Sequence, residues 1–144
     1  MSAMYSSFPL DEEIKSWLEE QAIEYPSSPE GRNPTLVEIK SAIANLEEYT
    51  IKETEAEVGK PWQAFIENKH DTERSDWATL NIITLTDDRN EFYFEKGCPK
   101  LIIKFMVFLA QHTGPLVLIC DAGDPPLVVT GEADPKALFE SWGN

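Results

Sequence analysis

Two aspartates follow a run of residues that is expected to form a buried strand. Asp121 and Asp124 come directly after the apolar segment Leu116–Cys120. Carboxylates in a loop at the end of a strand could share a hard cation such as Mg²⁺, or bind a small molecule, and Asp87 or Asp88 could join them. The same residue types also form tight turns, in which an Asp side chain bonds to its own backbone. A ligand-binding loop and a plain hairpin turn are therefore both open interpretations.

Histidine and cysteine are the other side chains that could carry chemistry. His70 and His112 are each a potential general base, because imidazole titrates near neutral pH. Each also has a structural explanation: His70 stands in a charged segment, and His112 stands at the end of an expected helix, where a cation complements the helix dipole. Cys98 and His112 could form a nucleophile pair, but nothing in their spacing requires it. The sequence therefore identifies no catalytic residue, and enzymatic activity stays an open question.

Motifs that hold cofactors are absent from the sequence. The chain has no P-loop, no G-x-G-x-x-G, no G-x-S-x-G and no H-x-x-x-H. Its seven glycines are isolated from one another, so no phosphate-binding loop is expected. We therefore expect no cofactor, and a metal only if the loop with Asp121 and Asp124 binds one.

The charge of the chain limits its partners. Twenty-six acidic residues against twelve Lys and Arg give a net charge of −14 over 144 residues, while 42% of the residues are hydrophobic. That apolar content indicates a folded core beneath a negative surface. Such a surface repels nucleic-acid backbones and anionic membranes, so we expect neither as a direct partner. It could attract a basic protein, and a protein partner is our expectation.

The start of the chain and its cysteines favour a cytoplasmic protein. The first residues lack the basic and apolar pattern of a secretory signal, and we expect residues 1–9 to be disordered. The longest apolar stretch, Leu101–Ala110, is interrupted by Lys104 and is much shorter than the roughly 20 residues of a membrane span. Cys98 and Cys120 are expected to be buried small hydrophobic residues in a reducing compartment.

The first third of the chain predicts two helices and a link. Apolar residues recur with a period near 3.6 over Leu10–Tyr25, with acidic residues opposite. Pro26–Pro34 contains three prolines and a glycine, so it cannot continue that helix. Thr35 and Glu38 have capping-box spacing and begin a second helix that runs to about Glu48. We expect the two helices to form a hairpin or a paired cover.

The rest of the chain predicts a sheet with two further helices. The apolar helix Lys100–His112 must be covered on more than one side, by the sheet and by either the N-terminal helices or a second subunit. Asp134 and Pro135 begin a closing helix that runs to Trp142. Period-two alternation and short apolar runs predict strands over Ile51–Val58, at an edge, and over Trp62–Glu67, Trp77–Thr86, Phe92–Phe94, Leu116–Cys120 and Pro126–Val129.

These elements predict a single α+β domain over residues 1–144, with a mainly antiparallel twisted sheet of about five or six strands against the central apolar helix. From the second helix onward, their order resembles that of class I secretion chaperones, which are small, acidic, dimeric proteins. The resemblance covers only the order of elements and implies a protein that binds partner polypeptides. The additional N-terminal helix and the proline-rich link depart from that arrangement.

Three functions fit this sequence. The first is a non-catalytic protein-binding module, chaperone-like or inhibitor-like, that forms a homodimer through the apolar helix or an exposed strand edge. The second is a metal-dependent hydrolase or small-molecule binder that uses Asp121 and Asp124, with Asp87 or Asp88. The third is an acidic immunity protein or nucleic-acid mimic that occupies the groove of a basic partner, which requires carboxylates on one face at phosphate-like spacing.

Overall fold

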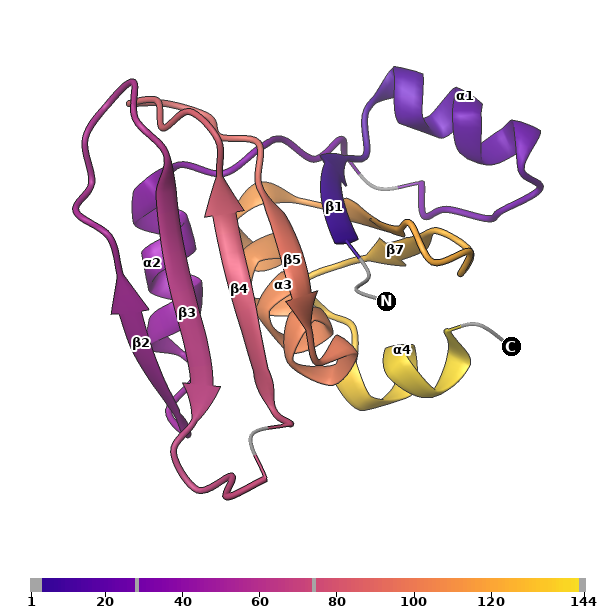
Figure 1. The fold of residues 1–144 in the computed structure, drawn as a ribbon. Coiled ribbons are helices and arrows are strands. Elements are labelled where there is room, and N and C mark those ends of the chain that lie inside the picture. Colours follow the sequence, from indigo (N-terminus) through magenta and orange to yellow (C-terminus); the bar gives the residue numbers. More distant parts are fainter. Residues whose placement is uncertain (1–3, 28, 74, 143–144) are drawn as a thin grey trace.

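The computed structural model contains one antiparallel sheet with helices on both faces (Figure 1). The structure describes residues 4–27, 29–73 and 75–142. Within them, seven strands lie in the order β2-β3-β4-β5-β1-β6-β7. This confirms the α+β single-domain fold. The sheet has one strand more than the five or six that the sequence predicts. The strands are β1 (Met4–Pro9), β2 (Tyr49–Glu53), β3 (Trp62–Asn68), β4 (Trp77–Ile82), β5 (Tyr93–Gly97), β6 (Leu116–Cys120) and β7 (Leu127–Val129).

Two helices of the described residues begin at the N-caps that the sequence predicts, Thr35 and Asp134. Thr35 accepts a hydrogen bond from the Glu38 N–H, and the Glu38 carboxylate accepts one from the Thr35 N–H. Pro99 and Pro135 occupy the first turns of the last two helices, where a missing N–H costs nothing. The helices are α1 (Glu12–Glu20), α2 (Leu36–Ala44), α3 (Pro99–Thr113) and α4 (Pro135–Ser141).

The additional strand, β1, lies in the interior of the sheet. Tyr5 is opposite Phe94 of β5 and also opposite Cys120 of β6. The expectation of disorder over residues 1–9 is therefore wrong for residues 4–9, and residues 1–3 lie outside the described part. So short a segment has little intrinsic preference, and it is held as a strand because β5 and β6 each offer an unpaired edge to it.

Helices α1 and α2 lie on opposite faces of the sheet, so the expected helical hairpin is wrong. Ile39 and Ile43 of α2 belong to the main core, next to α3. Leu18 of α1 packs instead with Val117 of β6 in a small separate cluster. Figure 1 shows the two helices far apart, α1 beside β7 and α2 beside β3. Both helices are amphipathic, but the sequence does not say which face of the sheet each one covers.

Helix α3 is buried within its own chain. Leu101, Ile102 and Phe105 are almost fully inaccessible to solvent. The sheet, α2 and α4 all contact this helix, so no second subunit is needed to cover it. Within the described residues, neither α3 nor another helix combines the length and the apolarity that crossing a membrane requires.

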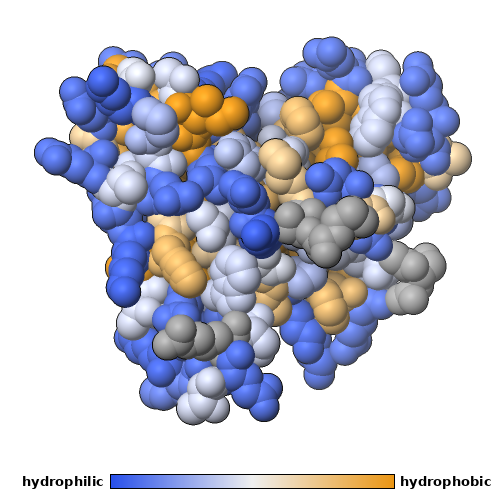
Figure 2. Space-filling view, in the orientation of Figure 1, coloured by the Kyte–Doolittle hydropathy of each residue, from blue (hydrophilic) through white to orange (hydrophobic). Residues whose placement is uncertain are grey.

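On the face of the sheet opposite α3, no helix of the described residues covers β2 to β5 and β1, because α1 covers only the β6 and β7 end. In Figure 1 the strands β2 to β5 lie in front of α2 and α3, so Figure 2 looks onto this open face. Phe65 and Trp77 stack on it with ring centroids 5.8 Å apart. The strand register places Gln63, Asn81 and Tyr93 side by side there. Polar and apolar side chains alternate across this surface in Figure 2.

Candidate functional site

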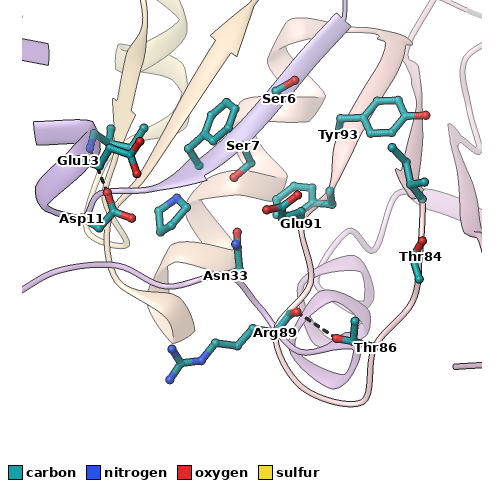
Figure 3. A pocket seen from close by; sticks show the side chains of 15 residues that line it. Ser6, Ser7, Asp11, Glu13, Asn33, Thr84, Thr86, Arg89, Glu91 and Tyr93 are labelled. Atoms are coloured by element: carbon teal, nitrogen blue, oxygen red, sulfur yellow. Dashed lines mark hydrogen bonds between the residues drawn. The ribbon is translucent and has the colours of Figure 1, made fainter. Parts of the chain in front are cut away.

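A groove with a volume of about 820 Å³ lies at one end of the open face. It is formed by the end of β1, the first turn of α1, Asn33 of the proline-rich link, and the segment between β4 and β5 (Figure 3). We call it the β1 groove, and define it by residues 6–9, 11, 13–14, 33, 83–84, 86, 89 and 91–93. These residues come from three separate stretches of the chain, 6–14, 33 and 83–93.

The groove exists because β1 is longer than its pairing with β5. Ser6 pairs with Tyr93, the first residue of β5. The Ser7 N–H then donates a long hydrogen bond of 3.4 Å to the Phe92 carbonyl. Beyond that point β1 continues along β6 as far as Pro9, while the chain before β5 turns away. A gap therefore opens between the last residues of β1 and the segment 89–92.

The wall formed by the segment between β4 and β5 is held by hydrogen bonds. The buried Asn90 side chain accepts from the Thr86 N–H at 2.8 Å, and the Thr86 hydroxyl donates to the Arg89 carbonyl at 3.0 Å, which Figure 3 marks. The Asn90 N–H donates to the Pro34 carbonyl at 2.7 Å. This wall and the link that carries Asn33 are therefore fixed to each other.

Two unpartnered polar atoms lie at the floor of the groove. Ser7 is only 4% exposed, and its Oγ has no hydrogen-bond partner. The Oδ1 atom of Asn33 is likewise covered and unpartnered. Figure 3 shows these two side chains next to each other in the middle of the groove, above Arg89. Leaving a buried polar atom unpaired costs about 1–3 kcal/mol, so a functional reason is expected for two of them in one place.

The rim of the groove combines apolar and acidic side chains. Phe8 and Ile83 are 39% and 70% exposed, and both line this groove, so they form part of one surface feature instead of lying singly. The residues that line the groove carry three carboxylates, of Asp11, Glu13 and Glu91, and one guanidinium, of Arg89. Asp11 is already used as the N-cap of α1, because its Oδ1 accepts from a backbone N–H at 3.0 Å. Glu13 and Glu91 form no ion pair with the described residues.

The loop with Asp121 and Asp124 connects β6 to β7 as a hairpin. Asp121 also fixes the start of β1, because its Oδ1 accepts from the Met4 N–H at 2.8 Å and its own N–H donates to the Met4 carbonyl. Within the described residues, no three His, Cys, Asp or Glu side chains are grouped so that they could hold a metal ion. Burial raises the pKa of the neighbouring Cys120 thiol, with Asp124 adding a smaller effect of the same sign.

The structure does not bring the four predicted aspartates together. Asp121 follows the end of β6, which lies beside the start of β1. Asp87 and Asp88 follow the end of β4, which lies toward the opposite end of the sheet because neighbouring strands are antiparallel. Both residues are exposed. They lie in the chain between Thr86 and Arg89, which line the β1 groove, but neither aspartate lines it. One site cannot use all four carboxylates.

The histidines and cysteines are also separated. His70 pairs with Glu48 at 3.2 Å, and both side chains are exposed. Cys98 is the N-cap of α3 and His112 lies in the last turn of the same 15-residue helix, about 20 Å away by helix geometry. The conceivable nucleophile pair is therefore not formed. Both cysteines are free thiols, but only Cys120 is buried, so the expectation of burial is wrong for Cys98.

Sequence reasoning missed the residues of the groove. Ser7 and Phe8 fall in the segment expected to be disordered, and Asn33 falls in the proline-rich link. The sequence pattern places Ile83 in a longer strand over Trp77–Thr86, but β4 ends at Ile82. One signal was present: Ile82 and Ile83 are adjacent, so an alternating strand must expose one of them.

Comparisons with protein-family models, with curated proteins and with solved structures found no match for this chain. The resemblance in element order to class I secretion chaperones therefore stays an analogy at the level of the fold.

Proposed function

We propose that this chain is a non-catalytic protein-binding module that holds a short segment of a partner polypeptide in the β1 groove. One observation carries the proposal: Phe8 and Ile83 are both exposed, and both line the same groove beside the unpaired carboxylates of Glu13 and Glu91. Exposed apolar residues with a polar rim are typical of protein interaction sites.

The charge of the groove favours a basic partner. Its side chains sum to three carboxylates against one guanidinium, and the whole chain has a net charge of −14. Complementary charge speeds association and selects against acidic competitors, including nucleic acids and anionic membranes. Two free thiols support a reducing, cytoplasmic location for this binding.

A homodimer is not required by this proposal. The main reason to expect a homodimer is the apolar helix at Lys100–His112, which a second subunit could cover. In the structure, α2, α4 and the sheet cover that helix within one chain. The exposed edge of β2 is left as the place where two copies could pair, although its Lys52 and Glu53 are the kind of charged residues that discourage pairing at an edge.

Selection from a library of random short peptides displayed on phage tests the proposal. We expect the selected peptides to contain an aliphatic or aromatic residue next to Lys or Arg. Their binding should weaken at least tenfold, about 1.4 kcal/mol, when Ile83→Asp places a charge at the rim. It should also weaken as the salt concentration rises, because the rim pairs are exposed.

The matched control is Val58→Asp, since Val58 is 63% exposed and lies outside the groove. Both variants add the same charge to an exposed aliphatic position, so they separate a local effect from the change in net charge. Equal binding by the two variants, or a library that yields no peptide sensitive to Ile83→Asp, would refute the groove as the binding site.

A further inference from the structure

We propose that the floor of the β1 groove receives the guanidinium group of an arginine side chain from the bound polypeptide. This inference rests on the proposed function and specifies the residue that the groove selects. It begins from the two unpartnered atoms, Ser7 Oγ and Asn33 Oδ1, which are the only such pair gathered in one place among the described residues.

The floor offers acceptors to a ligand that brings donors. The oxygen of the Asn33 amide is an acceptor only, and the Ser7 hydroxyl has two lone pairs. The Ser7 carbonyl points to the same side of β1 as its N–H, toward the gap, because both groups of one residue face one neighbour in an antiparallel ladder. It lies at the position where pairing with β5 ends. A donor-rich group therefore meets acceptors from both β1 and the link.

The charged rim selects a cationic donor. Glu13 lies on α1 and Glu91 on the opposite wall, so the two carboxylates approach the groove from different sides (Figure 3). Arginine has five N–H donors in a planar fork, whereas lysine has three donors around a single point. A guanidinium can bond to the floor with some of its N–H groups and still pair with a carboxylate at the rim. An ammonium group could not bond to the floor and pair with a rim carboxylate at the same time in this way, because its three donors surround a single nitrogen.

Asn33 must turn for the arginine to enter. Both floor oxygens are covered from solvent while the groove is empty. The backbone of Asn33 is held, because its carbonyl accepts from Arg32 at 3.3 Å, but no hydrogen bond restrains its side-chain oxygen. Rotation of the Asn33 side chain breaks no hydrogen bond at that oxygen and opens the floor to the incoming group.

Arg89 brings the one positive charge among the residues that line the groove. Its guanidinium does not bond to Ser7 or Asn33, whose oxygens stay unpartnered, and Figure 3 shows it pointing away from both. A guanidinium from the partner would be opposed by this like charge, so Arg89→Ala should strengthen its binding.

The test is an NMR titration of the isotope-labelled protein with three blocked amino acids: N-acetyl-arginine amide, N-acetyl-lysine amide and N-acetyl-citrulline amide. Citrulline has nearly the shape of arginine without its charge. We expect arginine to shift the side-chain amide signal of Asn33 and the backbone signal of Ser7, lysine to bind less tightly, and citrulline to cause no shift. Asn33→Ala should weaken arginine binding about tenfold, and Arg89→Ala should strengthen it about twofold.

Two further variants guard against loss of folding. Asn33→Asp keeps the shape of the side chain and adds a negative charge, so it should bind arginine more tightly and leave citrulline unchanged. Ser41→Ala changes an exposed hydroxyl on α2, outside the groove, so it should leave arginine binding as it is. Thermal unfolding of each variant shows whether the fold is intact.

The outcomes separate this inference from the proposed function. Equal shifts with arginine and citrulline, or no response to Asn33→Ala and Asn33→Asp, would overturn the inference. Selected peptides that depend on Ile83 but not on arginine or Asn33 would overturn it while the proposed function stands. Arginine binding at the floor without any groove-dependent peptide would uphold the guanidinium site and refute the polypeptide as its source.

Discussion

Arg32 and Glu38 join the proline-rich link to α2 through two parallel hydrogen bonds, Nη1 to Oε1 at 2.7 Å and Nη2 to Oε2 at 2.6 Å. The same guanidinium donates to the His112 carbonyl at 3.2 Å, at the end of α3. Glu38 at the same time closes the capping box with Thr35. One ion pair therefore fixes the link between α2 and α3, and Asn33, which follows Arg32, is placed at the groove by it.

Loss of this ion pair should destabilise the protein in a pH-dependent way. The hydrogen bonds from Arg32 lower the pKa of Glu38 from 4.5 to about 2. Because the pKa is lower in the folded state, the stabilisation is fully present above pH 4.5 and disappears as the pH falls through about 2. Glu38→Gln should lower the free energy of unfolding by roughly 2 kcal/mol at pH 7, allowing for partial exposure of the pair. Urea denaturation over this pH range measures it.

Glu47→Gln is the control for that experiment. Glu47 is exposed, and its side chain makes no ion pair with the described residues. Its loss should change the free energy of unfolding by less than about 0.5 kcal/mol at pH 7. A difference between Glu38→Gln and the wild type that persists unchanged near pH 2 would contradict the account of the ion pair.

Gly31 should not tolerate a side chain. A Cβ atom at this position would lie 1.8 Å from the carbonyl oxygen of Pro115, so the link would have to move away from the start of β6. Gly31→Ala should lower the free energy of unfolding by about 2 kcal/mol or more, as expected of a steric clash that the backbone must relieve. Thermal unfolding measures the change.

Gly123→Ala provides a comparison for the steric effect. Gly123 has a φ of +96°, but a Cβ there meets no atom within 4 Å. Its substitution should cost only the strain of a left-handed backbone, about 1 kcal/mol. If Gly31→Ala is no more destabilising than Gly123→Ala, the link does not pack against Pro115 as tightly as described.

Ser7→Ala should stabilise the protein while it weakens binding. The Ser7 hydroxyl is buried without a partner, so replacing it with a methyl group removes the cost of an unpaired polar atom. We expect an increase in the free energy of unfolding of about 1 kcal/mol. Ser6→Ala, at a partly exposed position, should leave stability unchanged. A stability that falls in Ser7→Ala would show that the hydroxyl has a partner in solution.

Tyr49→Phe should destabilise the sheet at its edge. The Tyr49 hydroxyl donates to Asp76 Oδ2 at 2.6 Å, and Asn68 donates to the same oxygen at 2.9 Å. Burial, followed by this bond to Asp76, raises the pKa of Tyr49. Its neutral form is therefore favoured by folding, and the stabilisation is lost only as the pH rises past 10. Removal of the hydroxyl should cost about 1 kcal/mol at pH 7, measured by urea denaturation.

Local patterns were sufficient for most individual elements. The capping box at Thr35, Pro135 in the first turn of α4 and the alternation over Trp62–Glu67 each predicted where the element begins. The end of α2 was predicted less well, because the helix stops at Ala44 and not near Glu48. These signals depend on residues within one or two turns of each other, so a sequence displays them directly.

The groove could not be predicted in the same way. Ser7 and Asn33 are ordinary polar residues in segments with no periodic pattern, and they meet only because β1 inserts between β5 and β6. The four aspartates were predicted to lie together, but the structure separates them. Asp87 and Asp121 stand in similar turns, but antiparallel pairing sends those turns toward opposite ends of the sheet.

An acidic α+β domain with an apolar central helix follows from composition and short-range periodicity, because these decide which side of each segment is buried. Three features became visible only in the folded chain: α1 and α2 cover opposite faces, residues 4–9 complete the sheet, and β1 extends beyond its pairing with β5 and leaves a groove. Strand order and helix placement depend on contacts between unpaired strand edges and apolar faces, and these contacts join residues that are far apart in the chain.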